Sequence, residues 1–335
     1  MAAYSVNHAE LSSPPNFADR LAAKVLEKKS QVCVGLDPQI GLIPPFLLAR
    51  QSGDEGSLGL DPSGVAEAFE EFSLAIIEAV EPHAVAIKLQ LACFEAYGPA
   101  GIGIMWQLAQ ACARAGLLVI ADGKRGDVGP SAALYSAAYL GIPPAAPPGT
   151  SPAQLEEHPE ETPVLAGFDA MTVNPLFGED GVRPFLDDCG RYGKGIFFLV
   201  RTSNPGGAQL QDLKLADGGL WHEHLARLVN RWGAGLTGNC GYSSAGAVVG
   251  ATRPEAIGRL RRMMPAAVFL LPGYGAQGAG AADVREAFDA EGLGGLVSAS
   301  RSIIYAGNGR GFAVEAAAAA ERMKKEVWGA VGQQS

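Results

Sequence analysis

The feature that most constrains this chain is an eightfold alternation of short apolar runs with longer amphipathic stretches. Runs that are apolar throughout, instead of alternating with polar residues, are typical of parallel strands covered on both faces. Most of the runs are bounded by Gly, Pro or Asp, which favour turns at strand ends. The eight runs span residues 31–37, 84–90, 117–124, 170–175, 195–202, 246–252, 267–273 and 295–300.

Helical patterns fill the intervals between these runs. Apolar side chains recur every three to four residues over 65–80 and again over 225–232. Thr252 and Glu255 fit a capping box, with Pro254 just inside the helix that follows. This alternation predicts an α/β protein, a (β/α)8 TIM barrel. Counting strands leaves an open doubly wound sheet as the alternative.

Three segments depart from the alternation. Residues 1–30 predict an N-terminal helical extension, with a helix from Phe17 to Glu27 that closes the barrel floor. Residues 38–62 and the Pro-rich insertion 141–166 predict surface loops, one of them a partial lid. A chain of 335 residues is long enough for two domains, but α/β barrels reach this length as one unit. We therefore expect a single domain, 1–335.

Composition narrows the class of function. The net charge is -9 and no long block of Lys or Arg occurs, which argues against nucleic acid as a partner. The N-terminus lacks the basic and apolar regions of a signal peptide, and no apolar run reaches about 18 residues, so we expect no membrane segment. Five cysteines without a pairing motif are typical of reduced thiols in the cytoplasm.

The segment 120–129, IADGKRGDVG, places several charges at the end of the third apolar run. Asp122 and Lys124 are two residues apart, so a strand turns both to the same face, and Asp127 follows in the turn. Lys88 ends the preceding run, on a strand about 4.8 Å away. Active sites of barrels are built at the carboxyl ends of the strands. The four charges therefore predict an active site, with a structural salt-bridge network as the alternative.

Glycine-rich loops after the last two runs predict a phosphate site. GYGAQG (273–278) follows the seventh run, and Ser300, Arg301 and Ser302 follow the eighth. In barrels these two loops commonly bind phosphate through backbone N–H groups, and an arginine can add a bidentate contact. The glycines also fit the GxGxxG motif of dinucleotide binding, but no acidic residue ends a strand about 20 residues later. We favour the phosphate loop.

Together these motifs resemble those of the orotidine 5'-phosphate decarboxylase family, over nearly the whole chain. ADGKRGDVG is similar to its DxKxxD signature, and VNPLFGEDG and VVGATRPE to its longer bacterial branch. One departure is Ser300, which stands where many members have glycine. The other matching motifs are VGLDPQ with Asp37, IKLQLACFEAYG with Lys88, RTSNPGG with Ser203, LLPGYGAQG with Gln277 and SASRSIIY with Arg301.

The resemblance implies decarboxylation of orotidine 5'-phosphate to UMP, the final step of de novo pyrimidine nucleotide biosynthesis, without a metal or organic cofactor. It implies that Lys124 donates a proton to C6 beside Lys88 and Asp122. It also implies a homodimer in which Asp127 reaches the neighbouring subunit's site. The five histidines lie outside every motif, so we expect no metal site. The substrate-binding residues that we expect are Asp37, Ser203, Asn204, Pro272, Gln277, Ser300 and Arg301.

Other interpretations stay open at this point. A magnesium-dependent sugar-phosphate aldolase or decarboxylase shares DxKxxD, but typically has a carboxylate where this chain has Lys88. An imine-forming aldolase would use Lys124 as its nucleophile. An inactive barrel would serve only as a scaffold. Asp37 and Ser203 also have purely structural interpretations, as a cap on a turn and as a stabiliser of a loop.

Overall fold

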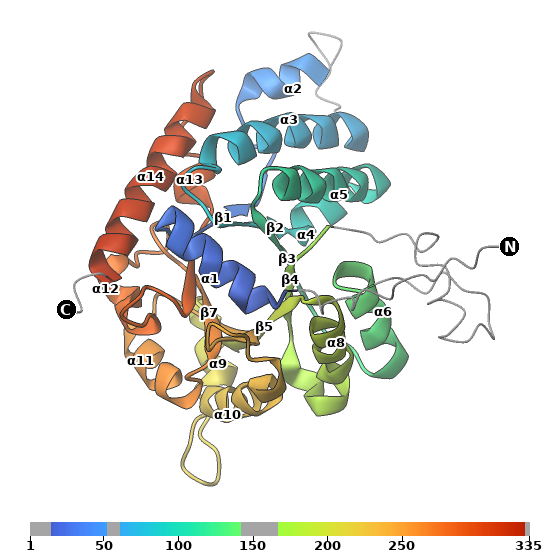
Figure 1. Ribbon diagram of the computed structural model, residues 1–335. Coiled ribbons are helices and arrows are strands. Elements are labelled where there is room, and N and C mark those ends of the chain that lie inside the picture. Colours follow the sequence, from blue (N-terminus) through green and yellow to red (C-terminus); the bar gives the residue numbers. More distant parts are fainter. Residues whose placement is uncertain (1–14, 52–60, 142–166, 332–335) are drawn as a thin grey trace, which may run out of the picture.

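The computed structural model describes residues 15–51, 61–141 and 167–331. Eight strands pair in sequence order, all in parallel, and the last pairs with the first to close a barrel (Figure 1). This confirms the (β/α)8 barrel and excludes the open sheet. The strands are β1 Val32–Leu36, β2 Ala86–Gln90, β3 Leu118–Arg125, β4 Ala170–Val173, β5 Gly195–Arg201, β6 Ser243–Val249, β7 Ala267–Pro272 and β8 Gly295–Ala299.

Helices surround the barrel, and Figure 1 shows α3 and α5 on one side of the ring and α10 and α11 on the other. The α-helices are α1 Phe17–Lys28, α2 Pro45–Gln51, α3 Pro62–Val80, α4 Leu91–Glu95, α5 Gly98–Arg114, α6 Gly129–Tyr139, α8 Gly178–Tyr192, α9 Ala208–Gln211, α10 Trp221–Gly233, α11 Pro254–Met263, α12 Ala281–Val284, α13 Arg301–Ile304 and α14 Phe312–Val331. Short 3-10 helices are η2 Pro175–Phe177, η3 Pro205–Gly207, η4 Ala234–Leu236 and η5 Arg285–Ala287.

The strands are apolar throughout because both of their faces are covered. Every residue of β1, β4, β6 and β8 is buried, against the barrel interior on one face and the helices on the other. The ring of Phe72 from α3 stacks on Tyr305 and on Phe312 of α14, which joins the first and last parts of the chain. This packing explains the absence of polar alternation in the eight runs.

Helix α1 lies across the floor of the barrel, as expected (Figure 1). Phe17 is 1% exposed and packs edge-on against Phe197 of β5, with ring centroids 5.9 Å apart. Arg20 pairs at 2.5 Å with Asp169, which directly precedes β4. Because α1 covers the amino ends of the strands, the carboxyl ends are left to form a site.

Two local predictions were wrong. Helix α11 has Arg253 as its N-cap and no side-chain cap, because the Thr252 hydroxyl instead donates to the carbonyl of Ser203 at 3.2 Å. The connection 38–62, expected to be a loop, contains α2. The insertion 141–166 lies outside the described residues from 142 onward, as do residues 1–14 of the N-terminal extension. None of the helices in the described ranges is long and apolar enough to cross a membrane.

Candidate active site

A pocket of about 480 Å³ opens at the carboxyl ends of the strands, a volume suited to a small-molecule ligand. Charged residues from β2 and β3 line one part of it, and the apolar side chains of Leu199, Val248 and Leu270 another. Within the described chain, its lining includes all but one of the site residues predicted from sequence. Those residues are Asp37, Lys88, Asp122, Lys124, Ser203, Asn204, Pro272, Gln277, Ser300 and Arg301.

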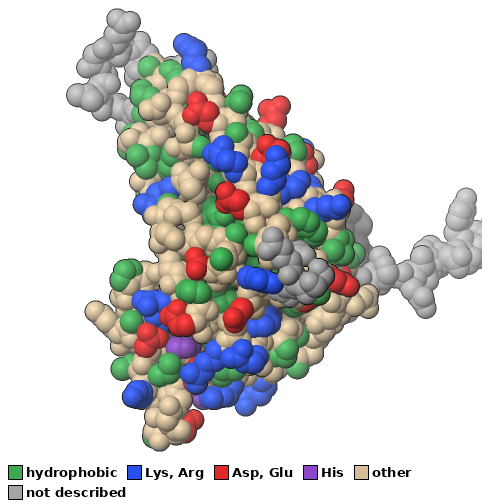
Figure 2. Space-filling model, turned by 90° about the vertical axis from the view of Figure 1, so that its left-hand side faces the viewer, with side chains coloured by type: hydrophobic (Ala, Val, Ile, Leu, Met, Phe, Trp, Pro, Cys, Tyr) green, Lys and Arg blue, Asp and Glu red, His purple; other side chains and the backbone are tan. Residues whose placement is uncertain are grey.

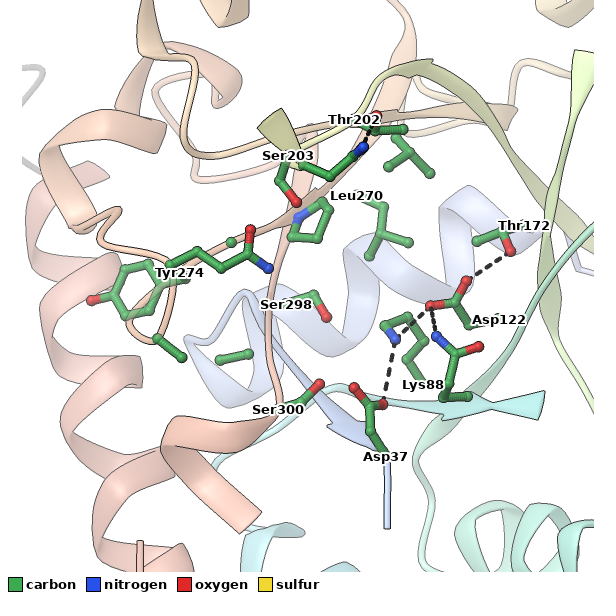
Figure 3. A pocket seen from close by; sticks show the side chains of 18 of the residues that line it. Asp37, Lys88, Asp122, Thr172, Thr202, Ser203, Leu270, Tyr274, Ser298 and Ser300 are labelled. Atoms are coloured by element: carbon green, nitrogen blue, oxygen red, sulfur yellow. Dashed lines mark hydrogen bonds and ion pairs between the residues drawn. The ribbon is translucent and has the colours of Figure 1, made fainter. Parts of the chain in front are cut away.

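The predicted charges meet at Asp122. Lys88 Nζ lies 2.6 Å from Asp122 Oδ2, and Lys124 Nζ lies 2.7 Å from Asp122 Oδ1. Lys88 also faces Asp37, with Nζ 3.8 Å from Oδ1, so that it lies between two carboxylates (Figure 3). The array therefore alternates in sign from Asp37 through Lys88 and Asp122 to Lys124.

Asp122 and Lys88 are both charged at neutral pH. Burial tends to raise the pKa of Asp122, but the ammonium groups of Lys88 and Lys124 outweigh burial and hold that pKa well below its usual range. Burial tends to lower the pKa of Lys88, but the carboxylates of Asp122 and Asp37 outweigh it and raise that pKa. The side chain of Lys124 is 46% exposed, against 6% for Lys88, so Lys124 is the ammonium group that an incoming ligand can reach.

Thr172 of β4 is a member of the site that the sequence interpretation missed. Its hydroxyl donates to Asp122 Oδ1 and accepts from the backbone N–H of Lys124, both at 2.9 Å. The second contact fixes an unusual backbone, because Lys124 has a φ of 47°, in the left-handed region that L-residues rarely adopt. The signal that could have found Thr172 is its hydroxyl in an otherwise apolar run.

Asp127 does not join the array within one chain. It is absent from the pocket lining among the described residues, and its Oδ1 accepts from the N–H of Val128 at 2.8 Å. Asp37 takes the fourth place instead. Its Oδ1 is buried without a hydrogen-bond partner in the described part of the chain, so it can accept a bond from a bound hydroxyl.

The predicted phosphate loops lie side by side at the pocket. Gly273 and Gly275 have φ values of 107° and 70°, which glycine adopts without a Cβ clash. Arg301 begins α13 and lines the pocket together with Gln277. Ser300 points into the same space as Asp37 in Figure 3. A side chain in place of Gly35 would meet the Ser300 hydroxyl, since an added Cβ would lie 1.9 Å from Oγ.

Four further polar residues of the pocket were not predicted, and Thr202 after β5 is one of them. Gln90 ends β2 with Nε2 3.4 Å from Asp122 Oδ2. Ser298 of β8 and Tyr274 of the glycine-rich loop also line the cavity. Tyr274 is tethered at its far end, because its hydroxyl donates to Glu326 of α14 at 2.5 Å. Thr202 adjoins a predicted site residue and the other three lie two residues from one, and that proximity was the only signal in the sequence.

Comparison with known proteins agrees with this geometry. Residues 160–318 match the model of the "Orotidine 5'-phosphate decarboxylase / HUMPS family". The chain is 42% identical to the orotidine 5'-phosphate decarboxylase of Rhodopirellula baltica, covering 90% of this chain and 92% of the relative. It is 38% identical to that of Deinococcus radiodurans, covering 95% and 99%.

Among solved structures, the OMP decarboxylase of Leishmania donovani superposes with a TM-score of 0.66 and 27% identity, covering 92% of this chain and 99% of the other. The likeness therefore extends over most of the chain. The family expected from the motifs is confirmed: the chain belongs to the orotidine 5'-phosphate decarboxylase family.

Proposed function

We propose that this protein removes CO2 from orotidine 5'-phosphate to give UMP, the last step of pyrimidine nucleotide biosynthesis. The names of its relatives support this reaction. The observation that carries it is the array of Lys88, Asp122 and Lys124 in one pocket with Arg301, because the reaction needs a proton donor and a phosphate contact within one substrate's length.

Lys124 is the proposed proton donor. When the bond between C6 and the carboxylate breaks, the electron pair stays on C6 and CO2 leaves. The ammonium group of Lys124 stabilises that charge and then transfers its proton to C6, which forms the C–H bond of UMP. The resulting amine takes a proton back from water, which its 46% exposed side chain can reach.

Asp122 would lie beside the carboxylate of the substrate. The repulsion between the two carboxylates ends as CO2 departs, and the depressed pKa of Asp122 keeps it ionised for this contact. Its hydrogen bonds to Lys88 and Lys124 also hold both ammonium groups in place. Asp122 therefore has a positioning role as well as an electrostatic one.

The remaining lining residues divide along the substrate. Asp37, whose Oδ1 has no hydrogen-bond partner in the described part of the chain, is the proposed acceptor for ribose hydroxyls. Ser203 and Asn204 would bind the base. Gln277 and Arg301 would bind the phosphate, and Pro272 and Ser300 complete the wall between these contacts. Binding energy from a remote phosphate can support the reacting end, so a nucleoside without phosphate should react far more slowly.

A homodimer would complete the site. Asp127 lies outside the pocket of its own chain, which fits a side chain that serves a neighbouring copy. Phe177 and the backbone of Asp127 both lie against Gly181. A Cβ added to Gly181 would lie 2.6 Å from the Phe177 Cβ and 2.9 Å from the Asp127 carbonyl oxygen. Exposed apolar side chains occur at the start of α6, along α6 and on η2, and a second copy is the proposed cover. They are Val128, Leu134, Tyr135, Leu176 and Phe177.

The face seen in Figure 2 differs from this patch. It belongs to the side of the barrel that carries α14, across from α6 and α8 in Figure 1, and its hydrophobic side chains are scattered among charges of both signs. We therefore place the dimer contact at α6 and η2. We also propose that the chain works as a single domain in the cytoplasm, where its five free cysteines would stay reduced.

The test is the loss of orotate absorbance when the protein is mixed with orotidine 5'-phosphate in the presence of a chelator. Turnover that persists supports the proposal. Turnover that stops with the chelator and returns with magnesium favours the metal-dependent relatives, and trapping of Lys124 by borohydride would favour an imine-forming aldolase. A protein that folds and shows no turnover would be the inactive scaffold.

A further inference from the structure

Arg201 at the end of β5 is a charged side chain enclosed by protein. Its side chain is 2% exposed. The guanidinium group binds Asp212 in a bidentate way, with Nε 2.9 Å from Oδ1 and Nη2 2.9 Å from Oδ2. Two parallel hydrogen bonds of this kind fix the orientation of both partners. The end of β5 is therefore tied to Asp212, which directly follows α9.

The ion pair continues into the segment that follows β5. Arg201 Nη1 donates to the carbonyl of Thr202 at 2.9 Å. Gln211 Oε1 accepts from the N–H of Thr202, and Gln211 Nε2 donates to the Thr202 hydroxyl, both at 2.9 Å. That hydroxyl in turn donates to Asn204 Oδ1 at 2.6 Å. Three hydrogen bonds from Arg201 and Gln211 therefore hold Thr202, and Thr202 holds Asn204.

Helix α10 supports the other side of this network. His222, which is 5% exposed, has Nδ1 2.7 Å from the carbonyl oxygen of Gln211 and 3.2 Å from Asp212 Oδ1. Two glycines show how closely the parts fit. A Cβ on Gly207 would lie 2.9 Å from the Thr202 hydroxyl, and a Cβ on Gly250 would lie 2.7 Å from Cα of Ser203. The segment has little room to shift.

The network and the pocket share only the segment between them. Thr202, Ser203 and Asn204 line the pocket, whereas Arg201 and Asp212 are not among its lining residues in the described chain. Arg201 can therefore affect a bound ligand only through residues 202–204. Since the segment carries the side chains assigned to the base under the proposed function, its position determines their reach.

We propose that Arg201, Gln211 and Asp212 form a clamp that positions Ser203 and Asn204 for the pyrimidine ring. This inference rests on the proposed function and deepens it, by assigning base recognition to a support outside the pocket. Lysine cannot replace Arg201, because one ammonium group cannot span both oxygens of Asp212 and also reach the Thr202 carbonyl. The clamp is a positioning device and touches no reacting atom.

The experiment compares buried Arg201 with Arg261, a half-buried arginine far from the pocket. Arg201→Lys should raise KM for orotidine 5'-phosphate about tenfold with little change in kcat, because a binding contact is lost in ground and transition states alike. Arg261→Lys is the matched control. Arg261 binds the carbonyls of Ala267 and Gly294 at the floor of the barrel, both at 2.7 Å, so this variant should lose thermal stability and keep its KM.

A double-mutant cycle tests whether Arg201 acts through the base contact. Ser203→Ala should raise KM, and adding Arg201→Lys to it should change KM much less than it does in the wild-type background. Full additivity, or a wild-type KM for Arg201→Lys alone, overturns the clamp. If Arg201→Lys does not fold, Gln211→Met removes the bonds to Thr202 without leaving a buried charge unpaired, and should raise KM severalfold.

Hydrogen exchange separates the clamp from the proposed function. In the free protein, Arg201→Lys should speed amide exchange over residues 202–212 and leave the floor strands unchanged. Unchanged exchange there contradicts the clamp even if the enzyme is active. Conversely, a wild-type protein without turnover refutes the proposed function, while faster exchange in the variant would still support the clamp as a support of the segment.

Discussion

At the residue scale, Asp122 links the charged residues of the site to one another. It accepts from Lys88, Lys124 and Thr172, and its side chain is 7% exposed. Opposite charges at this distance in a buried place favour the ionised carboxylate strongly. The stability of the fold and the activity of the site thus both depend on Asp122 being ionised.

Asp122→Asn should therefore change how the stability of the protein depends on pH in the acid range. The folded pKa of Asp122 lies below its ordinary value of 3.8, so its ionised form contributes stability that is complete above that value and lost as pH falls below it. Melting temperatures measured from about pH 5 to about pH 2 should fall more steeply for the wild type than for Asp122→Asn. Parallel curves would show that the pKa is not depressed.

Lys124 combines a chemical role with an unfavourable backbone. Lys124→Ala should lower kcat by about 10⁴-fold or more, because it removes both charge stabilisation and the proton. With φ at 47°, Lys124→Gly should be equally inactive but at least as stable as the alanine variant, since glycine accepts this conformation freely. Steady-state kinetics and urea unfolding measure the two effects. Residual turnover above about 1% in either variant would contradict the role of Lys124.

Sequence reasoning found most charged residues of the site for a simple reason. Each of three residues, Lys88, Asp122 and Lys124, lies toward the end of an apolar strand. A charge there is unfavourable in the core, so it must face the open end of the barrel. Thr172 was not predicted as a site residue, because threonine is common in β-strands. The positive φ of Lys124 depends on the bond from its N–H to Thr172, a contact between strands about 50 residues apart, and no local pattern encodes it.

At the scale of elements, the strands were predictable and their connections less so. A strand covered on both faces must be apolar, so eight runs could be counted. Strand β6 begins three residues before the predicted run, at Ser243, whose polar side chain is satisfied by the carbonyl of Gly233 at 2.8 Å. The predicted cap at Thr252 failed because Ser203 competes for its hydroxyl. Tertiary contacts decided both cases.

The position of helix α1 predicts that a substitution there can lower stability without affecting substrate binding. Phe17→Ala should lower the free energy of unfolding by about 3–5 kcal/mol, because it empties a fully enclosed site against Phe197. KM should not change, since α1 covers the end of the barrel opposite the pocket. Leu26→Ala, at a position 46% exposed on the same helix, is the control and should change little. Urea titration measures the free energy of unfolding, and a kinetic assay measures KM. An equal loss of stability in both variants would contradict the packing of Phe17 against Phe197.

At the scale of the whole molecule, the proposed homodimer makes the site a product of two chains. Lys124→Ala and Asp127→Asn should each be nearly inactive alone. Mixed under conditions that allow subunit exchange, they should regain about a quarter of wild-type activity, because half of the dimers are hybrids with one intact site in two. Recovery requires that Asp127 act across the contact. Mixtures that stay inactive although hybrids form would place Asp127 in its own chain's site.

One contact between β1 and the end of β8, which pair as neighbouring strands, also limits how the chain can change over time. Ser300 can keep its hydroxyl in this position only while position 35 is glycine, because a β-carbon there would lie 1.9 Å from Oγ. A lineage that gains a larger residue at 35 must also turn the Ser300 hydroxyl away or lose it. The two positions, 265 residues apart in the chain, should therefore covary among relatives.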